Sequence, residues 1–258
     1  VIAGTGATVV KHGNRAATSK SGSADVLEAL GIQLDMPIKS VAACARQVGI
    51  TFLFAMTFHP SMRFVGPTRK ILGIPTAFNY LGPMTNPARV SSSAIGVANP
   101  QMVEKMAWVF ANRGDHALVF RGDDGLDELT IATTSQIWEA SGGTLQKYVF
   151  NPEGYGIERS SLDNLRGGDA EYNASVFRAV LAGEGESAKD SLHAIRNAVL
   201  INAAAGLIAY RKNDGRSFEE RYTEALADAR QSIDTGAAAQ VLNAWVEFSH
   251  LVVETPSP

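Results

Sequence analysis

Short runs rich in β-branched and apolar residues alternate with longer helical stretches along most of this chain, and this alternation constrains the fold more than any other feature. The pattern is typical of an α/β domain with a largely parallel sheet flanked by helices. The predicted strands are residues 8–10, 51–55, 94–98 and 116–121, with three shorter runs around Thr130, Ile137 and Tyr148. Residues 191–252 are predicted to be almost entirely helical, with a turn at 212–216.

The alternation lapses between the second and third predicted strands. Residues 60–72 and 75–81 have helical patterns with no strand between them, so we expect a small helical excursion from the sheet. The chain is therefore predicted to have three segments. They are 1–55 as the first part of the α/β domain, 56–90 as part of a smaller helical domain, and 91–258 as the second part of the α/β domain with a helical C-terminus.

Composition excludes several classes of function. The 258 residues carry a net charge of -3, which argues against a general nucleic-acid or membrane-surface binder. The single cysteine, Cys44, excludes an internal disulfide and a multi-cysteine zinc site, and it suits a reducing compartment. No apolar run approaches the roughly 20 residues that span a bilayer. We therefore expect a cytoplasmic protein that binds neither nucleic acid nor membrane.

The loop after the first predicted strand has the composition of a phosphate site. It reads KHGNRAATSKSGSAD over residues 11–25. Its basic and hydroxyl side chains belong to Lys11, His12, Arg15, Lys20, Thr18, Ser19, Ser21 and Ser23. Gly13 and Gly22 would let the backbone approach a ligand closely. Because a strand-to-helix loop lies at the carboxyl edge of a parallel sheet, we interpret this one as a phosphate cradle. A solvated basic turn is the alternative.

A second loop, residues 122–128, reads GDDGLDE and directly follows the apolar run 118–120. Its carboxylates are Asp123, Asp124, Asp127 and Glu128. Such crowding is unfavourable unless cations neutralise it, and oxygen-only ligands point to Mg²⁺, which usually takes one or two carboxylates plus substrate phosphates. A solvated acidic turn is an equal alternative for this loop alone. The two loops together predict a polyphosphate ligand bridged by Mg²⁺.

Two arginines of the helical excursion could reach a pocket. Arg63 and Arg69 are six residues apart and so face different sides of a helix. An arginine beside apolar neighbours such as Phe58 and Met62 suits a small aromatic carboxylate. Judged by residue types alone, an exposed arginine on a packed helix is the preferred interpretation.

Four stretches of the sequence together resemble the anthranilate phosphoribosyltransferases of tryptophan biosynthesis. They are the basic loop, the acidic loop, FHPSMRFVGPTRKILGIPTAFNYLGPMTNPA over residues 58–88, and LRGGDAEYNA over residues 165–174. The resemblance runs from about residue 1 to about residue 250. It implies a helical domain plus an α/β domain in a homodimer. It also implies the transfer of phosphoribose from phosphoribosyl pyrophosphate (PRPP) to the amino group of anthranilate, giving phosphoribosylanthranilate and pyrophosphate.

The same resemblance implies the site residues. PRPP would be bound by Lys11, Asn14, Thr18, Ser19, Ser21, Gly22 and Ser23. Anthranilate would be bound by Asn14, His12, His59 and Arg69, with the guanidinium of Arg69 on the carboxylate. Asp127 and Glu128 would bind Mg²⁺, while Asp123 and Asp124 would either shape the loop or support the two metal ligands from behind. No covalent intermediate and no acid–base residue is expected; His59 or His12 would at most accept a proton after attack.

Other functions remain open at this point. A pyrimidine nucleoside phosphorylase of the same fold shares a similar basic loop. A nucleic-acid-binding relative would need a basic chain and a damaged acidic loop, and an inactive structural fragment is a third alternative. The family's Gly-Thr-Gly-Gly-Asp loop, which precedes the basic loop, is imitated by residues 3–6 but not matched. We therefore expect the chain to lack the family's N-terminal segment, to bind PRPP poorly alone and to turn over negligibly.

Overall fold

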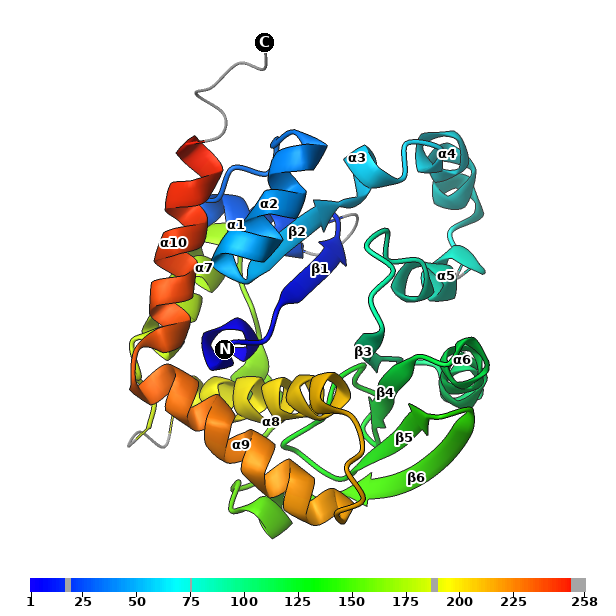
Figure 1. Cartoon of the computed structure of the whole chain (residues 1–258), viewed down its shortest axis with the longest axis vertical. Coiled ribbons are helices and arrows are strands. Elements are labelled where there is room, and N and C mark those ends of the chain that lie inside the picture. The colour runs from blue at the N-terminus through cyan, green and yellow to red at the C-terminus, as the bar shows by residue number, and fades with distance from the viewer. Residues whose placement is uncertain (17–19, 75, 187–189, 252–258) are drawn as a thin grey trace. The chain divides into compact units, whose positions relative to one another are not determined.

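The structure is a computed structural model that describes residues 1–16, 20–74, 76–186 and 190–251 (Figure 1). The chain forms two compact units, each described by itself below. The first unit comprises Val1–Ala7, Val90–Arg166 and Ala179–Ala238, and the second comprises Thr8–Arg89, Gly167–Arg178 and Ala239–Pro258. The predicted domain boundaries at residues 55 and 90 stay a prediction.

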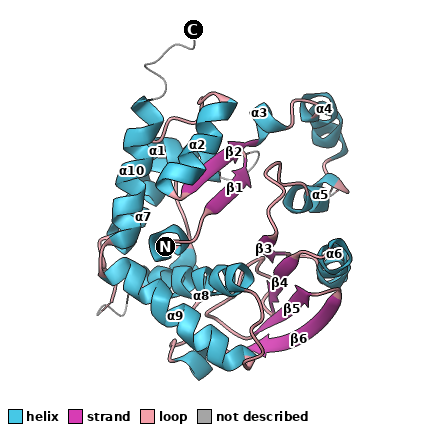
Figure 2. Cartoon of the chain, viewed as in Figure 1, coloured by secondary structure: helices cyan, strands magenta, loops and turns pink. Residues whose placement is uncertain are grey.

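The first unit contains a four-stranded mixed sheet in the order β3-β4-β5-β6 (Figure 2). β3 (Ser92–Gly96) is parallel to β4 (His116–Gly122), while β5 (Ser135–Ser141) and β6 (Thr144–Phe150) continue antiparallel. The α/β class is confirmed, but the sheet is less parallel than predicted. The physical reason is the two-residue turn Gly142–Gly143, in which both φ angles are positive, because such a turn joins antiparallel neighbours.

Strand β4 is buried on both faces, since six of its seven residues are buried. Helix α6 (Pro100–Arg113) packs against β4 and β5, and α8 (Ser191–Arg211) packs against β3 and β4. Asn99 caps the start of α6, because its Oδ1 accepts a hydrogen bond from the Gln101 backbone amide. The predicted strand-like run around Thr130 is wrong; that residue lies in the connection between β4 and β5.

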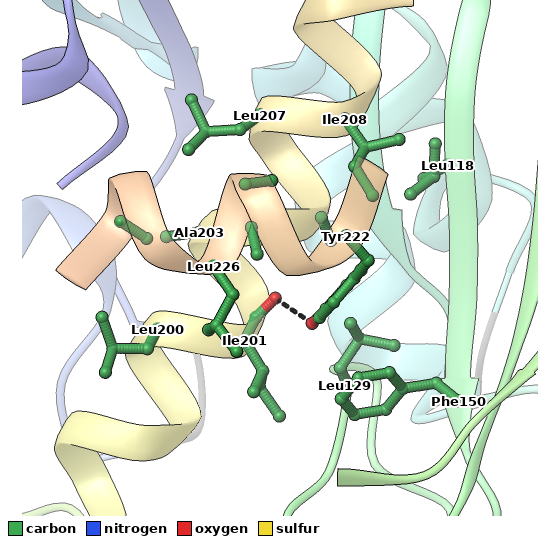
Figure 3. Packing of buried hydrophobic residues seen from close by; sticks show 14 of the residues in the cluster. Leu118, Leu129, Phe150, Leu200, Ile201, Ala203, Leu207, Ile208, Tyr222 and Leu226 are labelled. Atoms are coloured by element: carbon green, nitrogen blue, oxygen red, sulfur yellow. Dashed lines mark hydrogen bonds between the residues drawn. The ribbon is translucent and has the colours of Figure 1, made fainter. Parts of the chain in front are cut away.

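The core of the first unit lies between the sheet, α8 and α9 (Phe218–Asp234). Tyr222 is fully buried there, and its hydroxyl donates a 2.7 Å hydrogen bond to the carbonyl of Ile201 (Figure 3). Helix α8 is long and apolar enough to cross a membrane by length and composition, with a mean hydropathy of 1.4. However, 61% of that stretch is buried inside the protein, which is the pattern of a core helix.

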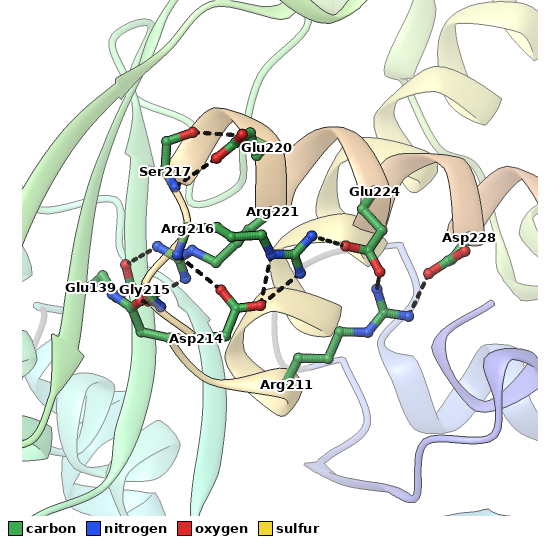
Figure 4. Close-up of polar contacts among 11 residues, drawn as sticks. Glu139, Arg211, Asp214, Gly215, Arg216, Ser217, Glu220, Arg221, Glu224 and Asp228 are labelled. Carbon is green, nitrogen blue, oxygen red and sulfur yellow. Dashed lines mark hydrogen bonds and ion pairs between the residues drawn. The ribbon is translucent and has the colours of Figure 1, made fainter.

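A buried ionic network joins β4, β5 and α9 in the first unit. Figure 4 shows its pair Glu139 and Arg221. The guanidinium of Arg221 donates two hydrogen bonds of 2.8 Å to the two carboxylate oxygens of Glu139. His116 Nε2 lies 3.0 Å from the same carboxylate, and its Nδ1 lies 2.6 Å from the Ala209 carbonyl. Burial raises the pKa of Glu139, but the hydrogen bonds from Arg221 and His116 outweigh it and lower this pKa to about 2.

The second unit contains a two-stranded parallel sheet. β1 (Val9–Gly13) pairs with β2 (Ile50–Phe54), so that Lys11 stands opposite Phe52. Helix α1 (Ser23–Ala29) and helix α2 (Ile38–Val48) connect the two strands. The predicted strands and helices of this stretch are therefore confirmed.

Cys44 lies on the buried face of α2. Its side chain is fully buried, and its Sγ donates a hydrogen bond of 3.2 Å to the carbonyl of Ile50. Burial raises the pKa of this thiol to about 11. The cysteine therefore packs as a small apolar residue.

The predicted helical excursion is confirmed as α4 (Met62–Leu72) and α5 (Phe78–Met84), preceded by a short helix α3 (Ala55–Phe58) that the sequence did not predict. Several apolar side chains of this region are exposed: Phe64, Ile71, Leu72 and Ile74. The remaining elements are η1 (Ile2–Thr5), η2 (Pro152–Tyr155), η3 (Leu162–Leu165), α7 (Ala170–Leu181) and α10 (Ala237–Leu251).

Candidate functional site

The two strands of the second unit bring two predicted motifs to one edge. β1 ends at Gly13 and continues into Asn14 and the basic loop, while β2 ends at Phe54 and continues through α3 to His59. Because the strands are parallel and in register, both motifs begin at the carboxyl edge of the same sheet. Ligands of open α/β sheets bind outside this edge.

The carboxylate of Asp25 closes the base of the basic loop. Its Oδ2 accepts hydrogen bonds from the backbone amides of Ala16 (2.9 Å) and Gly22 (2.8 Å). These two bonds lower the pKa of Asp25. A Cβ on Gly22 would lie 2.5 Å from the backbone nitrogen of Ala16, so the close approach of the two loop ends requires glycine. Asp25 therefore holds two positions of the loop, Ala16 and Gly22, close together.

The predicted PRPP residues have different environments. Lys11 and Asn14 are exposed, and Ser21, Gly22 and Ser23 are half-buried at the start of α1. Thr18 and Ser19 lie outside the described residues. Arg15 forms an ion pair with Glu28, to which its two terminal nitrogens donate hydrogen bonds of 2.5 and 2.7 Å. That arginine therefore fastens the loop to α1.

His12 and His59 contact each other. Their ring centroids are 4.7 Å apart with the rings at 67°. The Nε2 atoms of both rings are buried and have no hydrogen-bond partner among the described residues. Burial, followed by repulsion from His59, lowers the pKa of His12 below its usual value of 6.5, although a hydrogen bond with the backbone of Gly82 opposes this change. The His12 imidazole is therefore neutral at about pH 7.

The stretch LGPMTNP, residues 81–87, runs beside β1. The side-chain amide of Asn86 donates a hydrogen bond of 3.0 Å to the carbonyl of Val10. Gly82, in the same stretch, is the backbone partner of His12. These two contacts explain the structural role of the motif. It holds the chain that follows α5 against β1, the strand that carries His12.

Arg63 and Arg69 lie in different environments on α4, as predicted from their spacing. The guanidinium of Arg69 lies 5.6 Å from the centroid of the Phe78 ring, and its Nη2 donates to Asn79 Oδ1 at 3.4 Å. It thus lies against the first turn of α5. Arg63 is exposed and lies over the ring of Phe64 on its own helix.

In the acidic loop of the first unit, the carboxylates of Asp123 and Asp124 accept hydrogen bonds from neighbouring groups. Asp123 accepts hydrogen bonds from the side chains of Thr134 (2.5 Å) and Gln136 (3.1 Å). Asp124 accepts from the Thr130 hydroxyl (2.6 Å) and from the amide of Leu126 (3.1 Å). Both carboxylates are thus bound within the connection between β4 and β5 and at the start of β5, and their predicted role stays a prediction.

Asp127 and Glu128 are exposed, and two residues outside the loop hold their backbone in place. A Cβ on Gly96 would lie 1.5 Å from the carbonyl oxygen of Asp127, so the loop rests on the end of β3. Asn202 lies on α8, and its Oδ1 accepts a hydrogen bond of 2.9 Å from the Leu129 backbone amide. Its Nδ2 donates one of 3.0 Å to the Leu129 carbonyl. The position of the two exposed carboxylates is therefore well defined.

These carboxylates fit a magnesium site that a substrate completes. Among the described residues, no group of three or more His, Cys, Asp or Glu side chains could hold a metal by itself. Two exposed carboxylates at a rigid loop match the way Mg²⁺ is bound, by one or two carboxylates plus substrate phosphates. The acidic loop belongs to the first unit, and the other predicted site residues belong to the second.

Several residues that shape the site were not predicted from the sequence. They are Asp25, Gly96, Asn173 and Asn202, and all of them act through hydrogen bonds or close backbone contacts. Only Asp25 carried a local signal, because the carboxylate of an acidic residue three positions after a helix N-cap can accept a hydrogen bond from the N-cap amide, as it does here from Gly22. The partners of Asn173 and Asn202 are 152 and 73 residues away in the chain.

Comparisons with known proteins agree on one family. A family model described as "Glycosyl transferase family, a/b domain" matches residues 1–239. The chain is 54% identical over 249 residues to an anthranilate phosphoribosyltransferase of Arthrobacter sp. (strain FB24), covering 96% of this chain and 69% of that protein. It is 52% identical to the same enzyme of Rhodococcus opacus (strain B4), covering 96% of this chain and 67% of the relative.

Solved structures give the same result. The crystal structure of anthranilate phosphoribosyltransferase from Thermus thermophilus has a TM-score of 0.85 and 39% sequence identity, covering 96% of this chain and 70% of that one. The enzyme from Saccharomyces cerevisiae in complex with PRPP and Mg has a TM-score of 0.84 and 26% identity, covering 96% and 68%.

Proposed function

Because the chain belongs to the anthranilate phosphoribosyltransferase family, we propose that it transfers phosphoribose from PRPP to the amino group of anthranilate. The products are phosphoribosylanthranilate and pyrophosphate, in the biosynthesis of tryptophan. The observation that carries this proposal is the 54% identity over 96% of the chain, since a match of this extent includes both the basic and the acidic loop. The structure of a relative in complex with PRPP and Mg gives further support.

In this proposal the basic loop binds PRPP. Lys11 and Asn14 are exposed at the carboxyl end of β1, where their side chains can contact the pyrophosphate. The hydroxyl side chains and the close backbone approach at Gly22 add hydrogen-bond donors around it. A relative's structure with 4-fluoroanthranilate supports anthranilate as the second substrate. Arg69 would hold its carboxylate, and His12, Asn14 and His59 would line its site.

Asp127 and Glu128 are the residues that would hold Mg²⁺ in this proposal, because the resemblance to the family assigns the ion to them and both are exposed on the acidic loop. When bound, the ion would neutralise charge on the pyrophosphate group as it leaves. Asp123 and Asp124 contribute indirectly, since their hydrogen bonds fix the loop on which the two ligands stand.

The side chains have little acid–base work to do. The amine of anthranilate is conjugated with its ring and already neutral at about pH 7, so it needs no strong base before it attacks. Arg69 and the apolar wall around it would orient this amine against the ribose carbon. Since the His12 pKa is lowered, its imidazole is in the form that accepts the proton released after attack.

An assay with two substrate pairs tests the proposed function. The protein, expressed from its complete reading frame, is supplied either with anthranilate, PRPP and Mg²⁺ or with thymidine and phosphate. We expect the fluorescence of anthranilate to fall as it is consumed, and no release of thymine. Turnover of thymidine alone would instead identify a nucleoside phosphorylase.

Two substitutions should separate the two substrate sites. Arg69→Ala should raise the KM for anthranilate more than that for PRPP, because it removes the clamp on the carboxylate. Lys11→Ala should do the reverse, because it removes a charge near the pyrophosphate. Each change is expected to be about ten- to a hundredfold, the effect of losing one charge-assisted hydrogen bond.

Steady-state kinetics with each substrate varied in turn measures this separation. Arg63→Ala is the matched control, because Arg63 lies six residues earlier on the same helix and is exposed. It should leave both KM values within about twofold, as expected for a surface substitution. If Arg69→Ala and Lys11→Ala shifted the KM of the same substrate, the proposed division of the site would be wrong.

The homodimer and the cytoplasmic location that the resemblance implies also belong to this proposal. The apolar side chains exposed on α4 and just after it, among them Phe64 and Ile71, support an association surface in this region. Light scattering coupled to size-exclusion chromatography would measure the molar mass in solution. A monomeric mass over a wide range of protein concentration would contradict the dimer.

A further inference from the structure

The segment Gly167–Asn173, from the stretch LRGGDAEYNA, has no role in the proposed reaction so far. Within the second unit it lies against the basic loop. The side-chain amide nitrogen of Asn173 donates to Ser21 Oγ at 2.8 Å and to the Gly168 carbonyl at 3.1 Å. The Ser21 hydroxyl in turn donates to the same carbonyl at 3.3 Å. Ser21 and the pair Gly168 and Asn173, from two distant parts of the chain, thus form a closed ring of hydrogen bonds.

The orientation of the Asn173 amide follows from its partners. The backbone amide of Gly168 donates to Asn173 Oδ1 at 2.9 Å. Since that N–H can only donate, the atom facing it must be the amide oxygen, and the NH₂ group must face Ser21. Asn173 thus uses its donor and its acceptor at once. Aspartate would place a second carboxylate oxygen against the Gly168 carbonyl, and alanine would remove all three hydrogen bonds of the side chain.

The backbone around Asn173 holds this side chain in place. Its own amide donates to the Asp169 carbonyl at 3.0 Å, and Asp169 Oδ1 accepts from the Tyr172 amide at 2.9 Å, which caps the start of α7. The glycines before it leave room: a Cβ on Gly168 would lie 2.7 Å from the Tyr172 ring, and one on Gly167 would lie 3.0 Å from Asn173 Oδ1. Asn173 therefore projects from a rigid helix start.

The other contacts of the basic loop explain why this ring matters. Asp25 pins Ala16 and Gly22, but both of these contacts come from within the loop and its own helix. Asn173 reaches Ser21 from a separate segment, 152 residues further along the chain. It therefore fixes the second half of the loop, Lys20–Ser23, relative to the rest of the second unit.

We propose that Asn173 is a positioning residue for PRPP, which holds the Lys20–Ser23 half of the basic loop in its binding conformation through Ser21. This inference rests on the proposed function, since it names the ligand of the loop as PRPP. It also changes the role of Ser21. Its hydroxyl accepts from Asn173 and donates to the Gly168 carbonyl, so in this proposal Ser21 anchors the loop and its neighbours contact the ligand.

The test compares Asn173→Ala and Asn173→Asp with Ser175→Ala in the complete protein. Ser175 lies two residues further on α7, is exposed, and bonds only locally to the Tyr172 carbonyl among its described contacts. We expect both Asn173 variants to weaken PRPP binding, measured by calorimetry, by about tenfold. The KM for anthranilate should stay within about twofold. Ser175→Ala should change neither quantity by more than that.

A second measurement reads the loop without any substrate. Hydrogen–deuterium exchange at the amides of residues 20–24 should be faster in Asn173→Asp than in the parent protein or in Ser175→Ala, while the amides of α8 should exchange unchanged. If the parent protein did not use PRPP at all, the proposed function would fail, but this exchange comparison would still decide whether Asn173 holds the loop.

A double variant closes the test. If Asn173 acts through Ser21, Ser21→Ala combined with Asn173→Ala should weaken PRPP binding no more than Asn173→Ala alone. If the losses of PRPP affinity from the two single substitutions multiplied in the double variant, the two side chains would act separately, and the inference would be overturned. Unchanged PRPP affinity in both Asn173 variants would overturn it as well, as would an equal loss for both substrates together with faster exchange throughout the protein.

Discussion

Replacing Asp127 with Asn and Glu128 with Gln in one variant should lower kcat by about 100-fold or more at saturating substrate. Both carboxylates are exposed at a loop whose other two acidic side chains are bound by Thr130 and Thr134. The exchange to amides keeps size and shape but removes the charge that would hold Mg²⁺. The loop should keep its conformation, because Gly96 and Asn202 contact its backbone.

Steady-state turnover at increasing Mg²⁺ concentration measures this effect, and circular dichroism shows whether the fold is intact. A control variant, Glu153→Gln with Asp163→Asn, removes the same charge from two exposed surface positions of the first unit. It should retain parental turnover. Near-normal turnover of a well-folded Asp127→Asn, Glu128→Gln variant would refute the assignment of these two residues to the metal.

The second large effect concerns stability. Arg221→Met should lower the free energy of unfolding by about 3–5 kcal/mol, the usual consequence of removing one partner from a buried ion pair. Arg221 and Glu139 are 5% and 1% exposed, so the carboxylate left behind could not be hydrated. His116 also contacts this carboxylate, but an imidazole does not supply the permanent charge of a guanidinium. Urea unfolding followed by fluorescence measures the change.

The matched control is Arg216→Met, five residues earlier in the chain and exposed. Arg216 also pairs with two carboxylates, Asp214 and Glu224 (Figure 4), but exposed ion pairs contribute little because water solvates the separated charges nearly as well. We expect a much smaller change in the urea midpoint. Adding Glu139→Gln to Arg221→Met should recover part of the lost stability, and a failure to do so would show that the loss arises from packing.

The same network predicts a dependence of stability on pH. The pKa of Glu139 is lowered from 4.5 to about 2 in the folded protein, so the unfolded chain binds a proton at higher pH than the folded one. The stabilisation is fully present above pH 4.5 and is lost as the pH falls from 4.5 to about 2. Urea midpoints across this range should fall less steeply for Glu139→Gln. Equal slopes would contradict the prediction.

The order of strands and helices was predictable because it depends on local signals. Asn99 and Pro100 mark the start of α6, and Gly49 marks the end of α2 with a left-handed φ of 83°. The direction of the strands in the first sheet was harder to predict. It depends on the turn at Gly142–Gly143, whose conformation shows that β5 and β6 form a hairpin, whereas alternation of residue types alone gives no direction.

Those features of the site that follow from residue types were predictable from the sequence. Those that depend on contacts between residues distant in the chain were not. The crowding of carboxylates in the acidic loop was visible in the sequence. Which of these carboxylates accept hydrogen bonds from threonine hydroxyls could not be predicted. It depends on where Thr130 and Thr134 lie relative to Asp124 and Asp123 in the folded chain. Asn173 is a further case. Its partner Ser21 is 152 residues away, and no spacing rule connects two such positions.

The burial of Cys44 also makes the protein convenient to label. It is the only cysteine in the chain, its side chain is inaccessible, and at a pKa of about 11 it is almost entirely in the unreactive thiol form. A cysteine introduced at an exposed position such as Lys20 would therefore be the single group that a maleimide dye modifies. A fluorophore placed there would report directly on the basic loop as ligand is added, with no need to remove a native thiol first.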